Sequence, residues 1–414
     1  MVTGCGHPPG SPRDKRFCPT AFGHVSSGSL AEGFLLSLVS IFDKLQIAMK
    51  TLRTRIEEAA VSLAPYAVPV QGTLGRTEPE PDDETRFSFQ RDRDRIIHTQ
   101  AFRRLQGKTQ VFVAGEGDHY RTRLTHTMEV AQLSRDIART LSVNEDLAEC
   151  IALAHDLGHP PFAHMGEVAL DAWMQSHGSA FEHNEQSLRV VTLLEEHSAL
   201  HRGLNLHREV LEGLKKHPTQ RSVKDCAPSL EAQIVNVADE IAYNAHDCDD
   251  GIRAGLFTLT ELSAMSLVQE AIRLSETRKT SLRGALIHLL VHDLYATTDA
   301  ALAEQKIRTL EDVYARAAPI VQFSNAMTVT LQNLHEFLNE RMYSHPRVRE
   351  ANKQGQEIIT TLCGQFLMKP TEKILELQKR TGSGLSDAVK DYVAGMTDAF
   401  ARAQAQTATH HGYP

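Results

Sequence analysis

The sequence predicts an all-α protein. Its 414 residues suffice for one large or two ordinary domains, and a hydrophobic content of 41 % can supply a substantial core. Aromatic residues make up only 6 %, and long stretches of Ala, Leu, Glu, Gln and Arg contain few alternating Val, Thr or Tyr residues. We find no internal repeat and no βαβ alternation, which argues against a Rossmann or P-loop fold.

The chain divides into four stretches of different composition. Residues 1–48 carry Gly, Pro, Ser and Cys without sustained periodicity, so we expect a disordered extension. Residues 49–86 should form an N-terminal helix and then an exposed arm, because residues 72–86 are rich in Pro and acidic side chains. We expect a core over residues 87–256 and a C-terminal helical region over residues 257–414.

Several helices can be placed from the spacing of their apolar residues. Apolar residues recur at i, i+3, i+7 and i+11 from Val130 to Leu141, which predicts a helix with one face on a core. A second helix should end before Gly158 and the two prolines that follow it. The helices expected after the first span residues 145–155, 163–175, 184–197 and 230–249, with several more between residues 262 and 403.

Cysteine spacing and apolar runs indicate the compartment. The six cysteines are scattered without a CxxC pair, as expected for free thiols in a reducing cytoplasm. The best apolar run, residues 34–42, has about half of the roughly 18 to 20 residues that a membrane-spanning helix needs. We therefore expect a soluble, cytoplasmic protein without a membrane partner.

The charge of the chain differs between the whole and one part of it. The formal net charge is -8, which argues against a protein whose main role is to bind nucleic acid. Residues 86–123 nevertheless carry nine Arg and Lys residues against four acidic residues. This cluster could bind an anionic ligand such as a phosphate chain, or it could be a solvated helix face with a few ion pairs.

The strongest chemical signal is the segment HDLGHPPFAH at residues 155–164. His155 and Asp156 are adjacent at the end of an apolar helix, a position that suits neither residue unless something binds it. A neutral imidazole beside a carboxylate suits a divalent transition metal, or an ion such as Mg²⁺ or Mn²⁺. An isolated His-Asp pair is more often a helix cap or a surface pair, so the assignment depends on its neighbours.

Two more candidate ligands are expected near this pair. His126 lies 29 residues before His155 at the start of the preceding helix, and antiparallel packing of the two helices would bring the histidines together. Asp239 lies in the apolar helix expected over residues 230–249, on a polar stripe that continues to Asp250. A carboxylate at this place favours a bound metal or cation, unless the stripe is a solvated face.

Two further histidines, His159 and His164, follow the His-Asp pair. Glu167 is three residues after His164 at the start of a helix, so its carboxylate can orient the imidazole or share its proton transfer. The pattern therefore predicts an acid–base pair close to the metal.

These residues resemble a known superfamily. His126, His155-Asp156 and Asp239 match the H…HD…D signature of the HD hydrolases. The surrounding residues are similar to those of the bacterial dGTPase-like deoxynucleoside triphosphate triphosphohydrolases. The resemblance rests on the blocks FSFQRDRDRIIHTQAFRRLQGKTQVF, HYRTRLTHTMEVAQLSRDIAR, LAHDLGHPPFAHMGE, FEHNEQSLRVV and VADEIAYNAHDCDDGIRAG. It implies an HD-type helical core over residues 87–256, with additional C-terminal helices.

The resemblance also implies roles for single residues. One divalent ion, Mg²⁺, Mn²⁺ or another transition metal, would be bound by His126, His155, Asp156 and Asp239. The catalytic group near the α-phosphate would be His164, Glu167 and His183. Substrate would be bound by Gln110, Arg123, His159, Tyr243 and Asp247. Some relatives carry a lysine directly after the last metal-binding aspartate, where this chain has Glu240, so other cations must hold the triphosphate.

The implied reaction is hydrolysis of a deoxynucleoside triphosphate, dGTP or several dNTPs, to deoxynucleoside and triphosphate. One alternative is another HD phosphohydrolase, such as a nucleotidase or a phosphodiesterase. A second alternative is an HD protein that binds nucleic acid. The resemblance further implies a homo-oligomer, a tetramer or a hexamer, and leaves weak binding of single-stranded DNA open.

Overall fold

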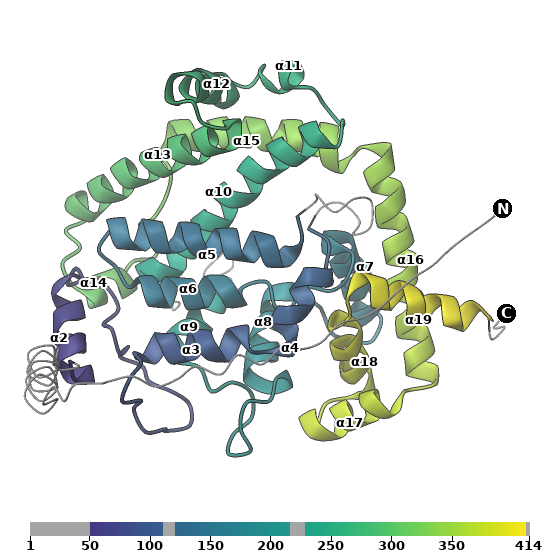
Figure 1. Ribbon diagram of the computed structural model, residues 1–414. Coiled ribbons are helices and arrows are strands. Elements are labelled where there is room, and N and C mark those ends of the chain that lie inside the picture. Colours follow the sequence, from purple (N-terminus) through teal and green to yellow (C-terminus); the bar gives the residue numbers. More distant parts are fainter. Residues whose placement is uncertain (1–49, 111–120, 216–227, 411–414) are drawn as a thin grey trace, which may run out of the picture. The chain divides into compact units, whose positions relative to one another are not determined.

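The computed structural model in Figure 1 describes residues 50–110, 121–215 and 228–410. The chain forms two compact units, Met1–Lys50 and Thr51–Pro414, and every element discussed below belongs to the second unit. The extension expected over residues 1–48 lies outside the described residues.

Helices make up all the regular structure of the described residues, so the all-α prediction is confirmed. Besides the helices, these parts of the chain contain isolated β-bridges and no strand. None of the described helices is long and apolar enough to cross a bilayer. The elements are α2 (Leu52–Val61), α3 (Ser88–Ile97), α4 (Gln100–Arg104), η1 (Leu105–Gly107), α5 (Arg123–Thr140), α6 (Glu145–Ala154), α7 (Ala163–Gln175), α8 (His183–Arg189), η2 (Val190–Leu194), α9 (Arg208–Leu214), α10 (Leu230–Arg253), α11 (Leu259–Leu262), α12 (Ser266–Arg278), α13 (Leu282–Glu304), α14 (Leu310–Tyr314), α15 (Asn325–Leu338), η3 (Asn339–Tyr343), α16 (Pro346–Met368), α17 (Glu372–Thr381), α18 (Leu385–Ala394) and α19 (Asp398–His410).

The expected helices around the His-Asp pair are confirmed with one exception. Helices α6 and α7 have the expected bounds to within a residue, and α10 continues to Arg253. The helix expected over residues 184–197 ends three residues early, at Leu194, and changes from α8 to a π-helical turn after Arg189. There the Val191 carbonyl accepts a hydrogen bond from the Leu204 N–H at 2.7 Å. The returning loop therefore takes the place of a further helical turn.

A first hydrophobic core is built on α5, α6 and α10. In Figure 1, α3, α6 and α5 lie one above another and α10 runs across them. Their apolar faces are buried, and the burial of each large side chain contributes about 1.5–3 kcal/mol to the stability of the folded state. The fully buried members include Val130, Ile137, Leu147, Ile151, Ile234 and Ile241. The first turn of α5, the residues directly after α6 and the middle of α10 carry the predicted metal ligands.

A second hydrophobic core joins α7 to the C-terminal helices. Leu170 and Met174 of α7 pack with Ile359 of α16 and Val389 of α18. Phe162, which directly precedes α7, belongs to this second core, whereas Leu157 belongs to the first. The segment after the His-Asp pair therefore passes from one core to the other within a few residues.

The stretch expected to be an exposed arm, residues 72–86, is mostly exposed but is fixed by a few ion-paired side chains. An ion pair joins Arg76 to the fully buried Asp92, and the two side chains are at most 6 % exposed. Glu80 pairs with Arg95 and accepts a hydrogen bond from Asn205 at 2.7 Å. Buried ion pairs of this kind explain why a Pro-rich, acidic segment without helix is held against α3.

Candidate active site

Three of the four predicted metal ligands, His126, His155 and Asp239, converge from different parts of the chain, and Asp156 lies beside His155. His126 lies in the first turn of α5, His155 and Asp156 follow α6, and Asp239 lies in α10. The His126 Nε2 is 2.9 Å from the Asp239 Oδ1. The His155 Nε2 is 3.8 Å from the same oxygen and 3.3 Å from the Asp156 Oδ1. Antiparallel packing of α5 and α6 thus brings residues far apart in sequence together as the spacing predicts.

The donor set fits a metal cation. The His155 Nδ1 is 2.6 Å from the Ala152 carbonyl oxygen, so this nitrogen carries the proton and Nε2 carries the lone pair. The His155 Nε2 is buried and has no hydrogen-bond partner among the described residues. A ring N–H bonded to a backbone carbonyl, which leaves the other nitrogen for the metal, is typical of a metal-binding histidine. His126, His155 and Asp239 can hold a metal ion together.

Asp156 connects this group to a second one. One oxygen accepts a hydrogen bond from the Arg123 Nη1 at 2.7 Å, and the other lies 3.0 Å from the His159 Nδ1. The His159 ring lies against that of His183, with ring centroids 3.8 Å apart. Asp156, His159 and His183 form a second set of side chains whose ligand atoms lie close enough to hold a cation.

A glycine permits this close arrangement. A Cβ atom at Gly158 would lie 2.3 Å from the His183 carbonyl oxygen and 2.2 Å from the Ser187 nitrogen. The Ser187 hydroxyl in turn accepts a hydrogen bond from the Gly158 N–H at 2.9 Å. Because a side chain cannot fit here, the backbone after the His-Asp pair touches α8, which begins with His183.

Glu167 links His164 to His183. Its Oε1 accepts hydrogen bonds from the His183 backbone N–H at 2.9 Å and from the His183 Nδ1 at 2.7 Å. Its Oε2 is 3.5 Å from the His164 Nδ1. Burial alone would raise the pKa of Glu167, but the hydrogen bonds from both histidines outweigh it and hold that pKa well below its ordinary value. The hydrogen bond with Glu167 raises the pKa of His164.

The side chains of this acid–base group differ in exposure. The His164 side chain is 78 % exposed, whereas those of Glu167 and His183 are 14 % and 17 % exposed. His164 can therefore meet a substrate while Glu167 and His183 are held in place behind it.

The polar stripe of α10, which includes Asp239, also contacts a tyrosine from another helix that the sequence did not indicate. The hydroxyl of Tyr343, in η3, donates a hydrogen bond to the Asp247 Oδ2. Burial raises the pKa of Asp247 to about 7, although the Tyr343 hydrogen bond opposes this. The rings of Tyr243 and Tyr343 both lie beside His335, with centroids 6.5 and 6.4 Å away. A pattern within α10 alone could not predict Tyr343, because it comes from a different helix about 100 residues later.

The remaining predicted substrate residues are Gln110 and Arg123. The Gln110 Oε1 is buried and lacks a partner among the described residues, and the same holds for the Arg123 Nε. Both atoms can therefore bind a ligand without breaking a hydrogen bond within the described parts of the protein.

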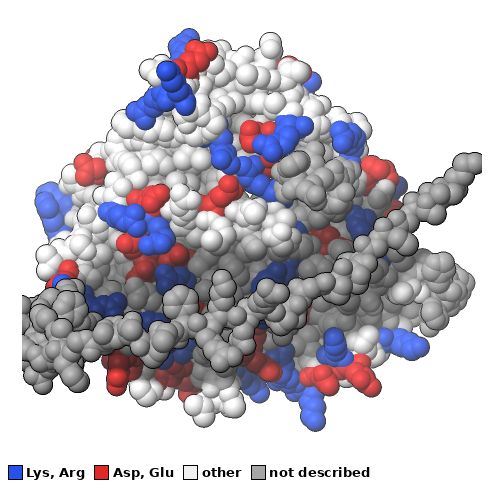
Figure 2. Space-filling model, in the orientation of Figure 1, with Lys and Arg blue, Asp and Glu red and all other residues white. Residues whose placement is uncertain are grey.

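Most of the basic cluster over residues 86–123 is ion-paired. Five of the pairs are Arg86–Asp83, Arg91–Glu80, Arg93–Glu149, Arg95–Glu80 and Arg121–Asp250. Figure 2 shows basic and acidic side chains intermixed on the face in view. The ion-paired interpretation therefore describes these five arginines, whereas Arg123 faces the metal group.

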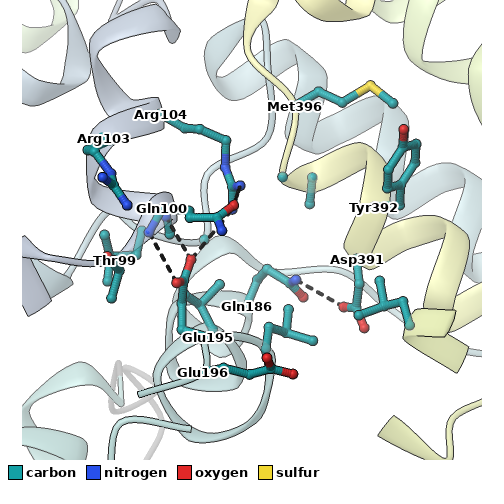
Figure 3. Close-up of a pocket in the computed structure, with 18 of the residues that line it drawn as sticks. Thr99, Gln100, Arg103, Arg104, Gln186, Glu195, Glu196, Asp391, Tyr392 and Met396 are labelled. Atoms are coloured by element: carbon teal, nitrogen blue, oxygen red, sulfur yellow. Dashed lines mark hydrogen bonds and ion pairs between the residues drawn. The ribbon is translucent and has the colours of Figure 1, made fainter. Parts of the chain in front are cut away.

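A pocket of about 860 Å³ lies beside the His-Asp segment. Figure 3 shows Arg103 and Arg104 of α4 on one wall and Asp391, Tyr392 and Met396 of the C-terminal region on another. Leu157 and Gly158 also line it, but the four predicted metal ligands do not.

This geometry defines an HD-type site, and comparison with known proteins agrees. The family model of the HD domain matches residues 123–244, which include all four predicted ligands. A model described as phosphohydrolase-associated domain matches residues 321–407, which include α16 to α18. The fold is that of an HD hydrolase.

Relatives narrow the assignment. A deoxyguanosinetriphosphate triphosphohydrolase-like protein of Azoarcus sp. (strain BH72) is 46 % identical over 363 residues, covering 83 % of this chain and 95 % of the relative. Deoxyguanosinetriphosphate triphosphohydrolase-like protein 1 of Deinococcus radiodurans is 44 % identical over 366 residues, covering 84 % and 97 %. The chain belongs to the family of deoxyguanosinetriphosphate triphosphohydrolase-like proteins.

Proposed function

We propose that this protein hydrolyses a deoxynucleoside triphosphate, dGTP or several dNTPs, to deoxynucleoside and triphosphate. The observation that carries the proposal is the convergence of two imidazoles and two carboxylates beside a separate histidine–glutamate group. The names of the relatives support the same substrate class. The enzyme is then a metal-dependent phosphoric ester hydrolase.

One divalent cation is proposed at His126, His155, Asp156 and Asp239. The arrangement supports this because the unpaired His155 Nε2 faces the Asp156 and Asp239 carboxylates. When bound, such an ion supplies positive charge beside the α-phosphate and acidifies a water molecule. The Arg123 guanidinium holds the Asp156 carboxylate in place with a charge-assisted hydrogen bond.

His164, Glu167 and His183 are proposed to handle the proton. Cleavage at the α-phosphorus releases the 5′-oxygen of the deoxynucleoside, which must gain a proton as it leaves. The hydrogen bond with Glu167 raises the pKa of His164 and so favours the protonated imidazole, which can donate that proton. Glu167 holds His164 in position, and His183 fixes Glu167 through two hydrogen bonds.

The substrate is proposed to lie between these two groups. Arg123 and His159 would contact the α-phosphate, since the Arg123 Nε is buried and unpaired among the described residues. Gln110, Tyr243 and Asp247 would bind the deoxyribose. A close fit at the 2′ position and hydrogen bonds to the 3′-hydroxyl would reject a ribonucleotide.

The decisive experiment is product analysis. The purified protein is incubated with each dNTP and each NTP in the presence of Mg²⁺ or Mn²⁺, and the products are separated by anion-exchange chromatography. We expect deoxynucleoside and intact tripolyphosphate in equal amounts from at least one dNTP. Pyrophosphate with dNMP, or only orthophosphate, would assign the site to another HD phosphohydrolase.

The nucleic-acid alternative requires a separate measurement. Binding of single-stranded DNA should be weak and should fall steeply with salt. Tight binding that survives in His155→Ala, with no nucleotide turnover by the wild type, would favour a nucleic-acid-binding HD protein. Light scattering of the purified protein tests the proposed tetramer or hexamer.

A further inference from the structure

A buried carboxylate of the C-terminal region accepts a hydrogen bond from residues 155–164, which we call the catalytic segment. Asp398, the first residue of α19, is 1 % exposed. Its Oδ1 accepts a hydrogen bond from the Phe162 N–H at 3.0 Å. Its Oδ2 accepts from the Thr109 N–H at 3.1 Å and from the Thr109 hydroxyl. Both oxygens are thus bonded to segments that adjoin predicted site residues, since Thr109 precedes Gln110.

The bond to Phe162 holds an unusual backbone. Phe162 and Ala163 have φ values of 64° and 55°, a left-handed conformation that favours glycine. They are the last residue before α7 and its first residue. Because α7 carries His164 and Glu167, the angles at Phe162 and Ala163 set where these two side chains point. Surrounding contacts must stabilise such a backbone, and Asp398 supplies one of them.

A buried lysine provides a second connection. Lys108 is 2 % exposed, and its ammonium donates hydrogen bonds to the His159 carbonyl and to the Ala394 carbonyl, the latter at 2.9 Å. His159 belongs to the catalytic segment, and Ala394 is the last residue of α18. One ammonium therefore joins the site to the end of a C-terminal helix.

A second buried carboxylate holds α8. Both oxygens of Asp391, in α18, accept hydrogen bonds from Arg189, at 2.9 and 2.7 Å. Asp391 also accepts from the Gln186 Nε2 at 3.0 Å, a bond drawn in Figure 3. Gln186 and Arg189 lie in α8, the helix that begins with His183. Each segment of the acid–base group is therefore bonded to the C-terminal region.

We propose that the C-terminal helical region positions the acid–base half of the active site, with Lys108, Asp391 and Asp398 as positioning residues. They act through the backbone of His159 and Phe162 and through α8, not by touching the substrate. The proposal rests on the proposed function because it assigns a role in the same reaction. Proton transfer requires a donor placed within a fraction of an ångström, so a small displacement lowers the rate.

The test compares Asp398→Asn with Asp92→Asn. Asp92 is a matched control, since it is also fully buried and both of its oxygens accept hydrogen bonds, one of them from the His207 backbone N–H at 2.7 Å. In Asp398→Asn the new NH₂ group must face an N–H donor, so the bond to Phe162 or Thr109 is lost. We expect kcat for dNTP hydrolysis to fall about ten- to hundredfold in Asp398→Asn. KM and metal content should stay unchanged, and Asp92→Asn should lower only the melting temperature.

Hydrogen exchange provides a readout that needs no activity. In Asp398→Asn, amide exchange should become faster over residues 159–167 and stay unchanged over α5. Lys108→Met keeps the apolar stem without the ammonium and should give the same exchange pattern. It replaces Asp398→Asn in the test if that variant does not fold. Unchanged kcat and unchanged exchange in a folded variant would overturn the proposal. A wild type that hydrolyses no dNTP would overturn the proposed function instead, and the exchange experiment would still test the positioning.

Discussion

The two halves of the candidate site are built on different hydrophobic cores. The metal half lies at the start of α5, directly after α6 and in the middle of α10, and the apolar faces of these helices form the first core. The acid–base half lies on α7 and α8, and α7 packs with the C-terminal helices in the second core. One short segment, residues 157–162, connects them. Metal binding and proton transfer should therefore respond to different substitutions.

Removing a metal ligand should give the largest effect. Asp239→Asn removes the carboxylate charge that both His126 and His155 face, so we expect metal loss and a fall in kcat of about 10³-fold or more. Metal content is measured by inductively coupled plasma mass spectrometry and turnover by product release. Glu240→Gln, the next residue on α10, is the matched control and should retain metal. Full metal content in Asp239→Asn would remove Asp239 from the ligand set.

Removing the carboxylate of the acid–base half should give the second largest effect. We expect Glu167→Gln to keep its metal and to lose about 10²–10³-fold in kcat. The hydrogen bond with Glu167 raises the pKa of His164 above its ordinary value. If His164 donates a proton, kcat falls as pH rises through that pKa. Without Glu167 the pKa is lower, so the falling limb of the pH profile of kcat should move to lower pH.

Asp171→Asn provides the control for that pH profile. Asp171 lies one turn after Glu167 on α7 and accepts a hydrogen bond from the Phe181 N–H at 2.9 Å. The falling limb should stay in place in this variant. An unmoved limb in Glu167→Gln would show that another group donates the proton.

The metal half was predictable from sequence because its residues are carried by local patterns. Amphipathic periodicity places His126, His155 and Asp239 on helices, and antiparallel packing of neighbouring helices brings them together. The helix bounds were confirmed for α6 and α7, whose ends carry caps or prolines.

The supports of the acid–base half were not predictable in the same way. No local pattern sets Lys108 or Asp398 apart from other charged residues, because the partners that bury them include residues more than 280 positions away. The π-helical turn after α8 has a similar origin, because the Val191 carbonyl is bonded by Leu204 of a returning loop. A pattern within one helix contains no information on such partners.

Two glycine substitutions should each affect only one half of the site, with smaller effects on activity than the carboxylate substitutions above. A Cβ at Gly355, in α16, would lie 2.7 Å from the Phe162 Cβ, and one at Gly213, in α9, would lie 2.4 Å from the Ile151 Cδ1. Overpacking of this kind costs about 1–3 kcal/mol. Gly355→Ala should lower kcat several-fold at saturating metal, because Phe162 precedes α7. Gly213→Ala should instead raise the metal concentration needed for half activity, because Ile151 is one turn before His155. Identical effects of the two variants on kcat and metal dependence would contradict the assignment of the two halves to different hydrophobic cores.

The smallest expected effect is on stability, where one carboxylate from each half should respond oppositely to pH. Burial raises the pKa of Asp247 to about 7, so the folded state favours its neutral form. The stability that this form contributes is fully present below the unfolded pKa of an Asp, about 4, and is lost progressively as pH rises from there to about 7. Asn cannot ionise, and its oxygen can still accept from Tyr343. Asp247→Asn should therefore raise the melting temperature at pH 8, by an amount that corresponds to roughly 1–4 kcal/mol, and raise it less at pH 5. Glu167 has a lowered pKa, so its charged form stabilises the fold above its unfolded pKa and Glu167→Gln should lower the melting temperature at pH 8. Melting curves of both variants at the two pH values measure the difference. If both variants shift the melting temperature in the same direction at pH 8, the assignment of a neutral, buried carboxyl to Asp247 and a charged, paired carboxylate to Glu167 is contradicted.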